Sequence, residues 1–387
     1  MNNPQGATIN DNAPRHRLRS VAGVLGLLVG SGLAFLLVLE VVLRLFDPQI
    51  AMVHPNGMWQ LDPVRGVRLT PSYSGRHWYP EFEIDVKISA QGLRDRAYGP
   101  KGADKVRIMT LGDSFTFGFG VEASESYPKQ LERKLNEVTE GERYEVINAG
   151  FPGYSTLQEL RYLEEDGLKL SPDIVLVGFF GINDFADNLL EPDRFALIEG
   201  FLYDRRSVDP EKIEDRSRWL PAIKAWLWAR SHAYRFTADR YRRLFVFRDD
   251  SDQGTLALPS PDADSQTRRI DFPLVSQAML GATTGYLGDI YRAAESHEAR
   301  AVLVLIPGMN MLGTPTEAWT VTTDSLKAHA DEHQVAVIDL AQAFGEAGAR
   351  KLTGSLWFSE NRHWKAPGHE LAARAIAERL WRSGLLE

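Results

Sequence analysis

The sequence contains no cysteine among its 387 residues. That absence excludes disulfide bonds, thiolate nucleophiles and cysteine-bound zinc sites, although it does not decide the compartment, because many proteins outside the cytoplasm lack disulfides. The chain also lacks a surplus of basic charge, since 44 Lys and Arg residues stand against 52 Asp and Glu residues, for a net charge of -8. Nucleic-acid binding needs a basic surface, so we expect no nucleic-acid partner.

The composition is that of a globular protein, with 44% hydrophobic and 25% charged residues. One stretch departs from it: residues 20–39, SVAGVLGLLVGSGLAFLLVL, carry no charge and reach the ~20 residues that span a bilayer. Three arginines precede the stretch, which keeps the N-terminus cytoplasmic by the positive-inside rule.

We therefore predict a cytoplasmic tail over residues 1–19 and a transmembrane signal anchor in the lipid bilayer over residues 20–46, with the remainder outside the cytoplasm. The alternatives are a cleaved signal peptide and a buried helix of a soluble protein. The anchor is favoured because the following EVVLRLFDP has no small-x-small cleavage site.

Residues 47–104 are rich in turn formers and aromatic residues and predict a small pre-domain of short strands and loops. Over residues 105–387, apolar runs of strand length alternate with amphipathic helical patterns. Val/Ile/Leu strands joined by helices are typical of a parallel sheet covered on both faces, so the fold class is α/β, a three-layer α/β/α sandwich with a five-stranded parallel sheet. The predicted strands are 105–111, 144–149, 173–180, 301–306 and 335–340.

One insertion, at about residues 185–272, interrupts the alternation. It has a Trp/Arg/Tyr-rich helical stretch followed by an Asp/Ser/Pro-rich linker. The helical stretch is compatible with lying on the membrane surface, forming a lid over the site, or packing against the domain.

In such sheets ligands bind at the carboxyl ends of the strands. The first of the five strands runs into LGDSFTFGFG, where Ser114 lies between Gly112 and Gly118. Glycines allow a tight strand-to-helix turn that would point the Ser114 hydroxyl into the crevice, with the serine N–H at a helix N-terminus.

The next two strands end in groups that can donate hydrogen bonds. NAGFPGYSTLQEL follows the second strand, so the Gly153 N–H can point into the same crevice, while Ser155 and Gln158 form a capping box for the next helix. GINDF follows the third strand and offers the side-chain amide of Asn183, with Asp184 holding the loop. A Ser, a Gly and an Asn at three successive strand ends suit the stabilisation of a tetrahedral oxyanion.

A serine nucleophile needs a base. Of the nine histidines, only His363, in RHWKAPGH, lies in a loop after the fifth strand. It is therefore the candidate base.

These four blocks, GDSFTFG, NAGFPGYS, GIND and RHWKAPGH, appear in the order of the SGNH/GDSL hydrolases, which the chain resembles over roughly residues 88–385. The resemblance implies a flavodoxin-like SGNH fold and serine ester chemistry without a metal or organic cofactor. It makes Ser114 the nucleophile and His363 the base, and its oxyanion hole consists of the Ser114 and Gly153 N–H groups with the Asn183 side chain. The anchor and the QGLRD stretch at residues 91–95 are similar to those of membrane-anchored bacterial members.

The sequence departs from this family at the acid, which usually lies three residues, and sometimes two, before the histidine. Those positions hold Glu360 and Asn361. Glu360 is the predicted third triad member, and Asn361 is the alternative.

The expected function is that of a membrane-anchored serine esterase acting on an ester substrate, an O-acetyl or other acyl ester on a glycan or lipid. Two alternatives remain open. One is an O-acyltransferase that modifies an envelope or secreted glycan with the same residues, and the other is a non-catalytic envelope- or glycan-binding protein.

Overall fold

The computed structural model divides the chain into two compact units, one containing Met1–Ala51 and Trp219–Leu244, the other Met52–Arg218 and Phe245–Glu387. The structure describes residues 13–46, 57–79, 81–139, 141–190, 194–198, 201–204, 227, 230–245, 275–309, 317–359 and 361–386.

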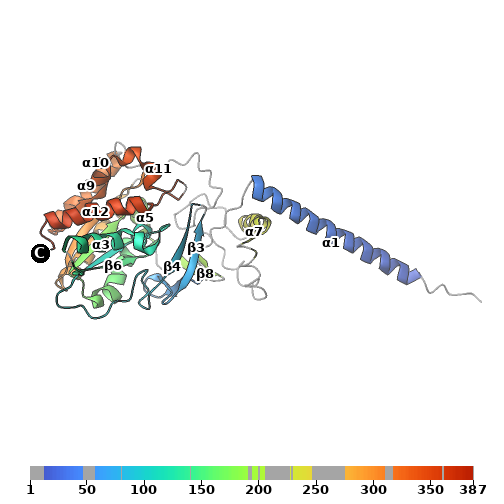
Figure 1. Ribbon diagram of the computed structural model, residues 1–387, viewed down its shortest axis with the longest axis horizontal. Helices are drawn as coiled ribbons and strands as arrows, with labels where there is room; N and C mark the ends of the chain where they lie inside the picture. Colours follow the sequence, from blue (N-terminus) through green and yellow to red (C-terminus); the bar gives the residue numbers. More distant parts are fainter. Residues whose placement is uncertain are drawn as a thin grey trace, which may run out of the picture. The chain divides into compact units, whose positions relative to one another are not determined.

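A five-stranded parallel sheet forms the centre of the second unit (Figure 1). Its order is β11-β10-β7-β5-β6, so the first strand of the sheet in the sequence, β5, lies between the next two. Val, Ile and Leu dominate these strands because both faces of the sheet are covered, and the predicted fold class is confirmed. The strands are β5 (Val106–Gly112), β6 (Tyr144–Gly150), β7 (Ile174–Phe179), β10 (Arg300–Leu305) and β11 (Ala336–Asp339).

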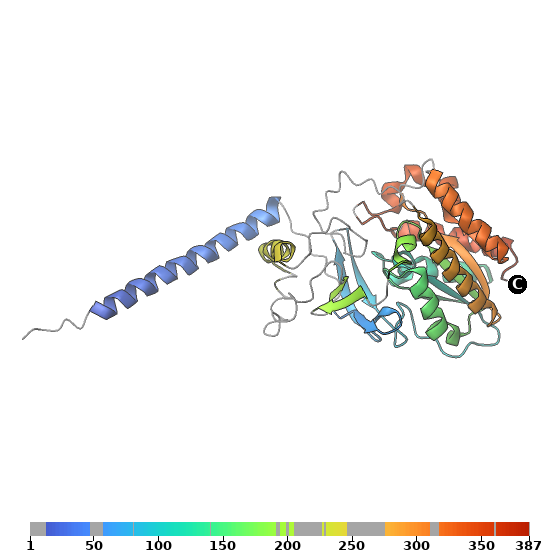
Figure 2. The ribbon, with the colours of Figure 1, turned by 180° about the vertical axis from the view of Figure 1, so that it is seen from behind.

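Helices cover both faces of the sheet and complete three layers (Figures 1 and 2). One face packs against α3 (Tyr127–Thr139), α10 (Leu340–Glu346) and α12 (Ala366–Arg382). The other packs against α4 (Thr156–Tyr162), α8 (Gln277–Glu295) and α9 (Glu317–Glu332).

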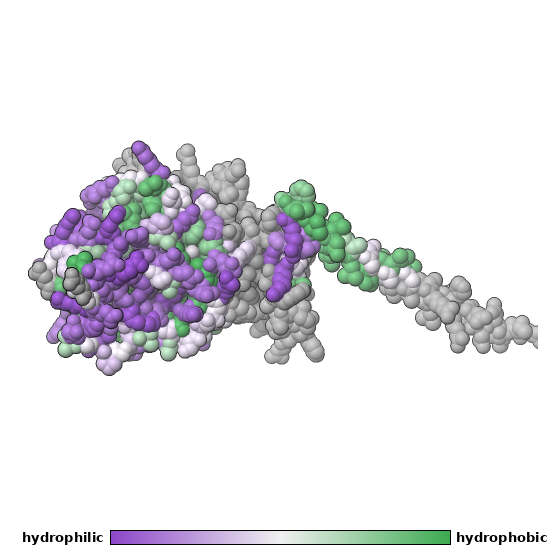
Figure 3. All heavy atoms as spheres, viewed as in Figure 1, coloured by the Kyte–Doolittle hydropathy of each residue, from purple (hydrophilic) through white to green (hydrophobic). Residues whose placement is uncertain are grey.

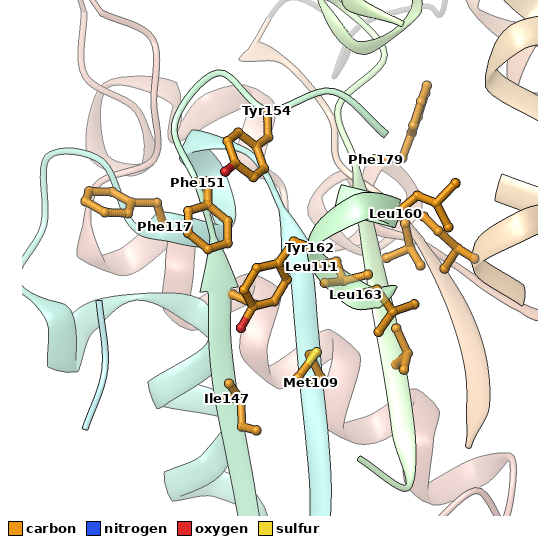
Figure 4. Packing of buried hydrophobic residues seen from close by; sticks show 14 of the residues in the cluster. Met109, Leu111, Phe117, Ile147, Phe151, Tyr154, Leu160, Tyr162, Leu163 and Phe179 are labelled. Atoms are coloured by element: carbon orange, nitrogen blue, oxygen red, sulfur yellow. The ribbon is translucent and has the colours of Figure 1, made fainter. Parts of the chain in front are cut away.

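Successive strand residues alternate between these faces, as strand geometry requires. In β5, Ile108 enters the cluster under α3 and α12, whereas Met109 and Leu111 enter the opposite cluster with Leu160 and Leu163 (Figure 4). The sheet is thus buried on both sides.

Among the described residues, three hairpins and three short α-helices complete the second unit. The hairpin residues Met58, Val67 and Ile84 belong to the same buried cluster as Met109, so the segment before β5 packs on the main core. The domain boundaries predicted from the sequence, 47–104 and 105–387, stay a prediction. The hairpin strands are β1 (Trp59–Asp62), β2 (Gly66–Leu69), β3 (Ser74–Tyr79), β4 (Phe82–Lys87), β8 (Phe195–Ile198) and β9 (Phe201–Asp204), and the short helices are α2 (Ser114–Phe117), α5 (Asp184–Asp187) and α11 (Thr353–Leu356).

The first unit consists of α1 (Ala13–Phe46) and α7 (His232–Phe245). Within α1, the segment Gly26–Phe46 has a mean hydropathy of 2.4, and only 6% of this apolar stretch is buried. Apolar side chains cover its surface (Figure 3). The Glu40 carboxylate accepts the backbone N–H groups of His232 (3.1 Å) and Ala233 (2.8 Å). A carboxylate at a helix N-terminus satisfies donors that have no partner within the helix, so Glu40 ties the two helices together.

Most of the predicted insertion, including its Asp/Ser/Pro-rich linker, lies outside the described residues. Its described parts are β8, β9 and α7 with a few neighbouring residues. The three alternatives for its helical stretch stay open.

We predict that Gly150→Ala destabilises the second unit. Gly150 ends β6 beside the Ser114 turn, and a Cβ there would overlap the backbone of Phe117, coming 2.8 Å from its Cα. Forced shifts in a packed region cost about 1–3 kcal/mol, which chemical unfolding followed by circular dichroism would measure. Gly141→Ala is the control, since its nearest atom would be the Thr139 carbonyl oxygen at 3.8 Å. Equal stability of the two variants would contradict the prediction.

Candidate functional site

Ser114 lies on a sharp turn at the carboxyl end of the central strand. β5 ends at Gly112 and α2 begins at Ser114, so a single residue separates strand from helix. The Asp113 carboxylate caps this helix by accepting the Phe115 N–H at 2.9 Å, and Gly118 ends it after one turn with a left-handed φ of 80°. The result is a partly exposed serine on an otherwise buried segment.

A buried arginine holds the segment that follows the serine. The Arg94 guanidinium donates to the carbonyl oxygens of Phe117 (3.1 Å), Gly118 (2.7 Å) and Val121 (2.7 Å). Burial lowers the pKa of Arg94 to about 10, so it remains charged at neutral pH. Arg94 belongs to the QGLRD stretch of the sequence. Its hydrogen bonds to the segment after Ser114 could not be predicted from that stretch, because they depend on the tertiary fold.

The sheet order places Gly153 and Asn183 on either side of Ser114. β6 and β7 both pair with β5, with Gly150 and Gly178 in register with Gly112. The loops after these strands therefore leave the same edge of the sheet.

Each of these three residues can offer a hydrogen-bond donor. Among the described residues, neither the Ser114 N–H nor the Gly153 N–H has a hydrogen-bond partner. Asn183 Nδ2 donates one hydrogen to Asp187 Oδ2 at 3.1 Å and carries a second. The predicted capping box of Ser155 and Gln158 is confirmed, as is the bond that holds the third loop, in which Asp184 Oδ2 accepts the Phe180 N–H at 2.7 Å.

His363 reaches the serine from the other end of the chain. Its Nε2 lies 2.7 Å from Ser114 Oγ. The ring packs against Phe119 and Phe115, with centroid distances of 4.7 and 5.0 Å. An antiparallel bridge between Trp357 and Trp364 closes the loop that carries it.

Asn361 sets the tautomer of this histidine. Its backbone oxygen lies 3.0 Å and its side-chain oxygen 3.2 Å from His363 Nδ1. Both oxygens can only accept, so Nδ1 carries the proton and Nε2 is left to accept the Ser114 O–H. Asn361 Oδ1 also accepts the His363 backbone N–H at 2.9 Å, which fixes the loop.

Glu360, the acid predicted from the sequence, lies outside the described residues. A carboxylate that the sequence reasoning missed is Glu81, in the turn between β3 and β4, which accepts the backbone N–H of Asn361 at 3.0 Å. The two residues are 280 positions apart. No local pattern in the sequence indicates such a contact.

Burial controls the charges of the site. It lowers the pKa of His363 to about 4, against the opposing effects of the Asn361 hydrogen bond and the Glu81 charge. Burial, with a contribution from nearby Asp187, raises the pKa of Asp113 to about 7. It also raises the pKa values of Glu159 and Asp184 well above their ordinary values, and the proximity of Asp113 adds to the effect.

The site thus combines a hydroxyl, an uncharged imidazole that can accept its proton, and hydrogen-bond donors on both sides. This arrangement suits attack on a carbonyl carbon with stabilisation of the resulting oxyanion. The described part of the chain has no group of three or more His, Asp or Glu residues able to hold a metal ion.

The residues of this site lie in a part of the chain that matches a known protein family. The model of the GDSL-like lipase/acylhydrolase family matches residues 110–371, a range that includes Ser114, Gly153, Asn183 and His363. No curated protein matches the chain. The structure is similar to that of a lipase/acylhydrolase from Enterococcus faecalis, at 16% identity over 71% of this chain and 95% of that one, with a TM-score of 0.39.

The structure is also similar to that of a catalytic mutant of Axe2, an acetylxylan esterase from Geobacillus stearothermophilus. The identity is 15% over 72% of this chain and 96% of that one, with a TM-score of 0.41.

We predict that His363 titrates far below an ordinary histidine, because burial against Phe115 and Phe119 disfavours the charged ring. The midpoint of its ring resonances should lie near pH 4 instead of 6.5, so the imidazole is neutral throughout the neutral range. Nuclear magnetic resonance of histidine-labelled, detergent-solubilised full-length chain would measure it, with His363→Gln identifying the signal. A midpoint at or above 6.5 would contradict this account of the site.

Proposed function

Because the chain belongs to the GDSL-like lipase/acylhydrolase family and is an ester-hydrolysing enzyme, we propose that Ser114 is its nucleophile and His363 its general base. The observation that carries this assignment is the 2.7 Å distance between Ser114 Oγ and His363 Nε2. No other hydroxyl lies within hydrogen-bond distance of that nitrogen among the described residues.

The proposed reaction has two stages. Ser114 Oγ attacks the ester carbonyl carbon while its proton passes to His363 Nε2, and the tetrahedral intermediate collapses as the imidazolium returns the proton to the leaving alcohol. Water, deprotonated by the same nitrogen, then attacks the acyl-serine, and the imidazolium returns that proton to Ser114 Oγ as the acid is released. A His363 that is neutral at pH 7 is ready to accept a proton at the start of either stage.

The oxyanion hole proposed for both stages consists of the Ser114 N–H, the Gly153 N–H and Asn183 Nδ2. The two backbone donors have no partner among the described residues, and the amide has a second hydrogen beyond its bond to Asp187. Donors that are already in place need no reorganisation when negative charge develops on the substrate oxygen, which is why such groups lower the barrier.

Two neighbouring residues remain proposals for the third member of the triad. Asn361 is supported by its two oxygens beside His363 Nδ1, which orient the ring but bring no full charge. Glu360 rests on the sequence spacing alone.

Ser114→Ala should abolish ester turnover and leave the fold intact, because only one hydroxyl is removed. Losing a triad member costs several orders of magnitude in kcat, which hydrolysis of p-nitrophenyl acetate by the full-length chain would show. Ser124→Ala, at an exposed serine ten residues further on, is the control and should behave as wild type. Retention of more than about a tenth of the activity by Ser114→Ala would remove Ser114 from the mechanism.

The proposal extends to location: α1 anchors the enzyme in a bilayer, with its N-terminus cytoplasmic and the catalytic unit outside. Support comes from the 21-residue, predominantly apolar segment Gly26–Phe46 and from the arginines that precede it. A signal sequence passes the same test of length and composition. An enzyme placed there would act on acyl esters of envelope glycans or lipids.

The absence of cysteine allows a direct test of this topology. With a membrane-impermeant maleimide on bacterial cells whose outer membrane is permeabilised, Glu137→Cys should be labelled in intact cells and Asn3→Cys only after lysis. Glu137 is suitable because its side chain is 65% exposed. The reverse pattern would place the catalytic unit in the cytoplasm, and release of a shortened chain from the membrane would identify a cleaved signal sequence.

A further inference from the structure

The turn between β3 and β4 places the carboxylate of Glu81 on the loop that carries His363. Glu81 Oε1 accepts the N–H of Ser359 at 2.6 Å and its hydroxyl at 2.8 Å, and Oε2 accepts the N–H of Asn361 at 3.0 Å. Both carboxylate oxygens are thus committed to one short segment. Asn361 in turn contacts His363 Nδ1 through its own oxygens.

The hairpin is held in this position by aromatic packing. Phe82, next to Glu81, lies 5.5 Å from Phe358 and 5.4 Å from Phe119 between ring centroids. Phe119 is also one of the two rings against His363. The packing that buries the imidazole therefore also fixes the carboxylate beside its loop.

The reaction creates a charge that the described immediate neighbours of His363 do not balance. When Nε2 takes the serine proton the ring becomes a cation, and a triad acid normally stabilises it. Both groups bonded to Nδ1 among the described residues are neutral oxygens of Asn361. The cation forms on a partly buried ring that packs against two phenylalanines, so a nearby negative charge is screened less than it would be in water.

We infer that Glu81 is a positioning residue that supplies, through the Asn361 segment, the negative charge for the His363 imidazolium. Glu81 does not touch Nδ1. It holds the Asn361 oxygens against the ring and places a full negative charge behind them. The inference rests on the proposed roles of Ser114 and His363 and assigns part of the task of the triad acid to the hairpin before the main sheet.

The charged or titratable groups to consider near His363 come from four segments, and two of them, Glu81 and His369, interact electrostatically with it. The negative charge of Glu81 raises the pKa of His363 and so stabilises the imidazolium, whereas the larger effect of burial lowers this pKa. The pKa of His369 is lowered to about 3, chiefly by burial, so that ring is uncharged when His363 titrates. The groups are Glu81 from the hairpin, Asp113 before Ser114, Arg362 and Lys365 in the His363 segment, and His369 of α12.

The test compares Glu81→Gln with wild type in the full-length, detergent-solubilised chain, using p-nitrophenyl acetate. We expect kcat to fall about tenfold or more with KM little changed, less than the roughly 10⁴-fold loss when a carboxylate bonded directly to the histidine is neutralised. Removing a negative charge lowers the pKa of His363, so the acid limb of kcat/KM should move to lower pH. Glu81→Asp, which keeps the charge, should restore much of kcat.

Two controls separate charge from loop anchoring. Ser359→Ala removes the hydroxyl hydrogen bond to Glu81 but keeps the carboxylate, so the acid limb of its kcat/KM profile should stay in place. Glu83→Gln removes a carboxylate of the same hairpin that pairs with Arg76 at 3.0 Å, and it should match wild type. Melting temperatures report whether each variant is folded.

Wild-type kcat and an unmoved acid limb in folded Glu81→Gln would overturn the inference. If Glu360→Gln then lowered kcat and moved the acid limb of kcat/KM, Glu360 would be the residue that supplies the negative charge. Activity that survives Ser114→Ala would instead overturn the proposed nucleophile, so the two failures are distinguishable. An acid limb that moves in Glu81→Gln but not in Ser359→Ala supports the assignment.

Discussion

The hydrogen bond between Ser114 and His363 joins residues 249 positions apart, and much of the second unit serves to bring them together. The serine depends on a strand that is buried on both faces and ends in a one-residue turn. The histidine depends on a loop closed by the Trp357–Trp364 bridge at the start of α12. Both depend on the parallel order of the sheet, because only parallel strands deliver their carboxyl ends to one edge.

The same packing creates the central electrostatic problem of the site. The imidazole packs against two phenylalanines, and burial lowers its pKa to about 4, which keeps the base unprotonated but makes its protonated form costly. A buried cation is tolerated only when fixed charges or dipoles replace the lost water. Asn361 provides dipoles, and the Glu81 carboxylate, which accepts hydrogen bonds from Ser359 and Asn361, provides a charge. The hairpin before the sheet is therefore an electrostatic part of the site as well as a part of its core.

The turn that carries Ser114 is also held by ionisable side chains that are costly to bury. Asp113 is fully buried beside the serine and caps the first turn of its helix, yet burial raises its pKa to about 7. Arg94 keeps its charge although it is buried, because the charges of Glu122 and Glu125 oppose the effect of burial on its pKa, and backbone carbonyl oxygens accept its hydrogen bonds. The serine turn is thus held by groups that would be unfavourable if they were left without partners.

The sequence by itself determined the elements and the chemistry that local patterns encode. The apolar runs of β5, β6 and β7 predicted the strands, the glycines around Ser114 predicted its turn, and the position of His363 after the last strand predicted its place at the same edge. These features depend on residues close together in the chain. The contacts of Glu81 and Arg94 could not be predicted in this way, because nothing in the sequences of the hairpin and of the QGLRD stretch indicates which distant loops they meet. Only the tertiary structure decided those contacts, since they arise where the packed hairpin brings a carboxylate against a loop 280 residues further along the chain.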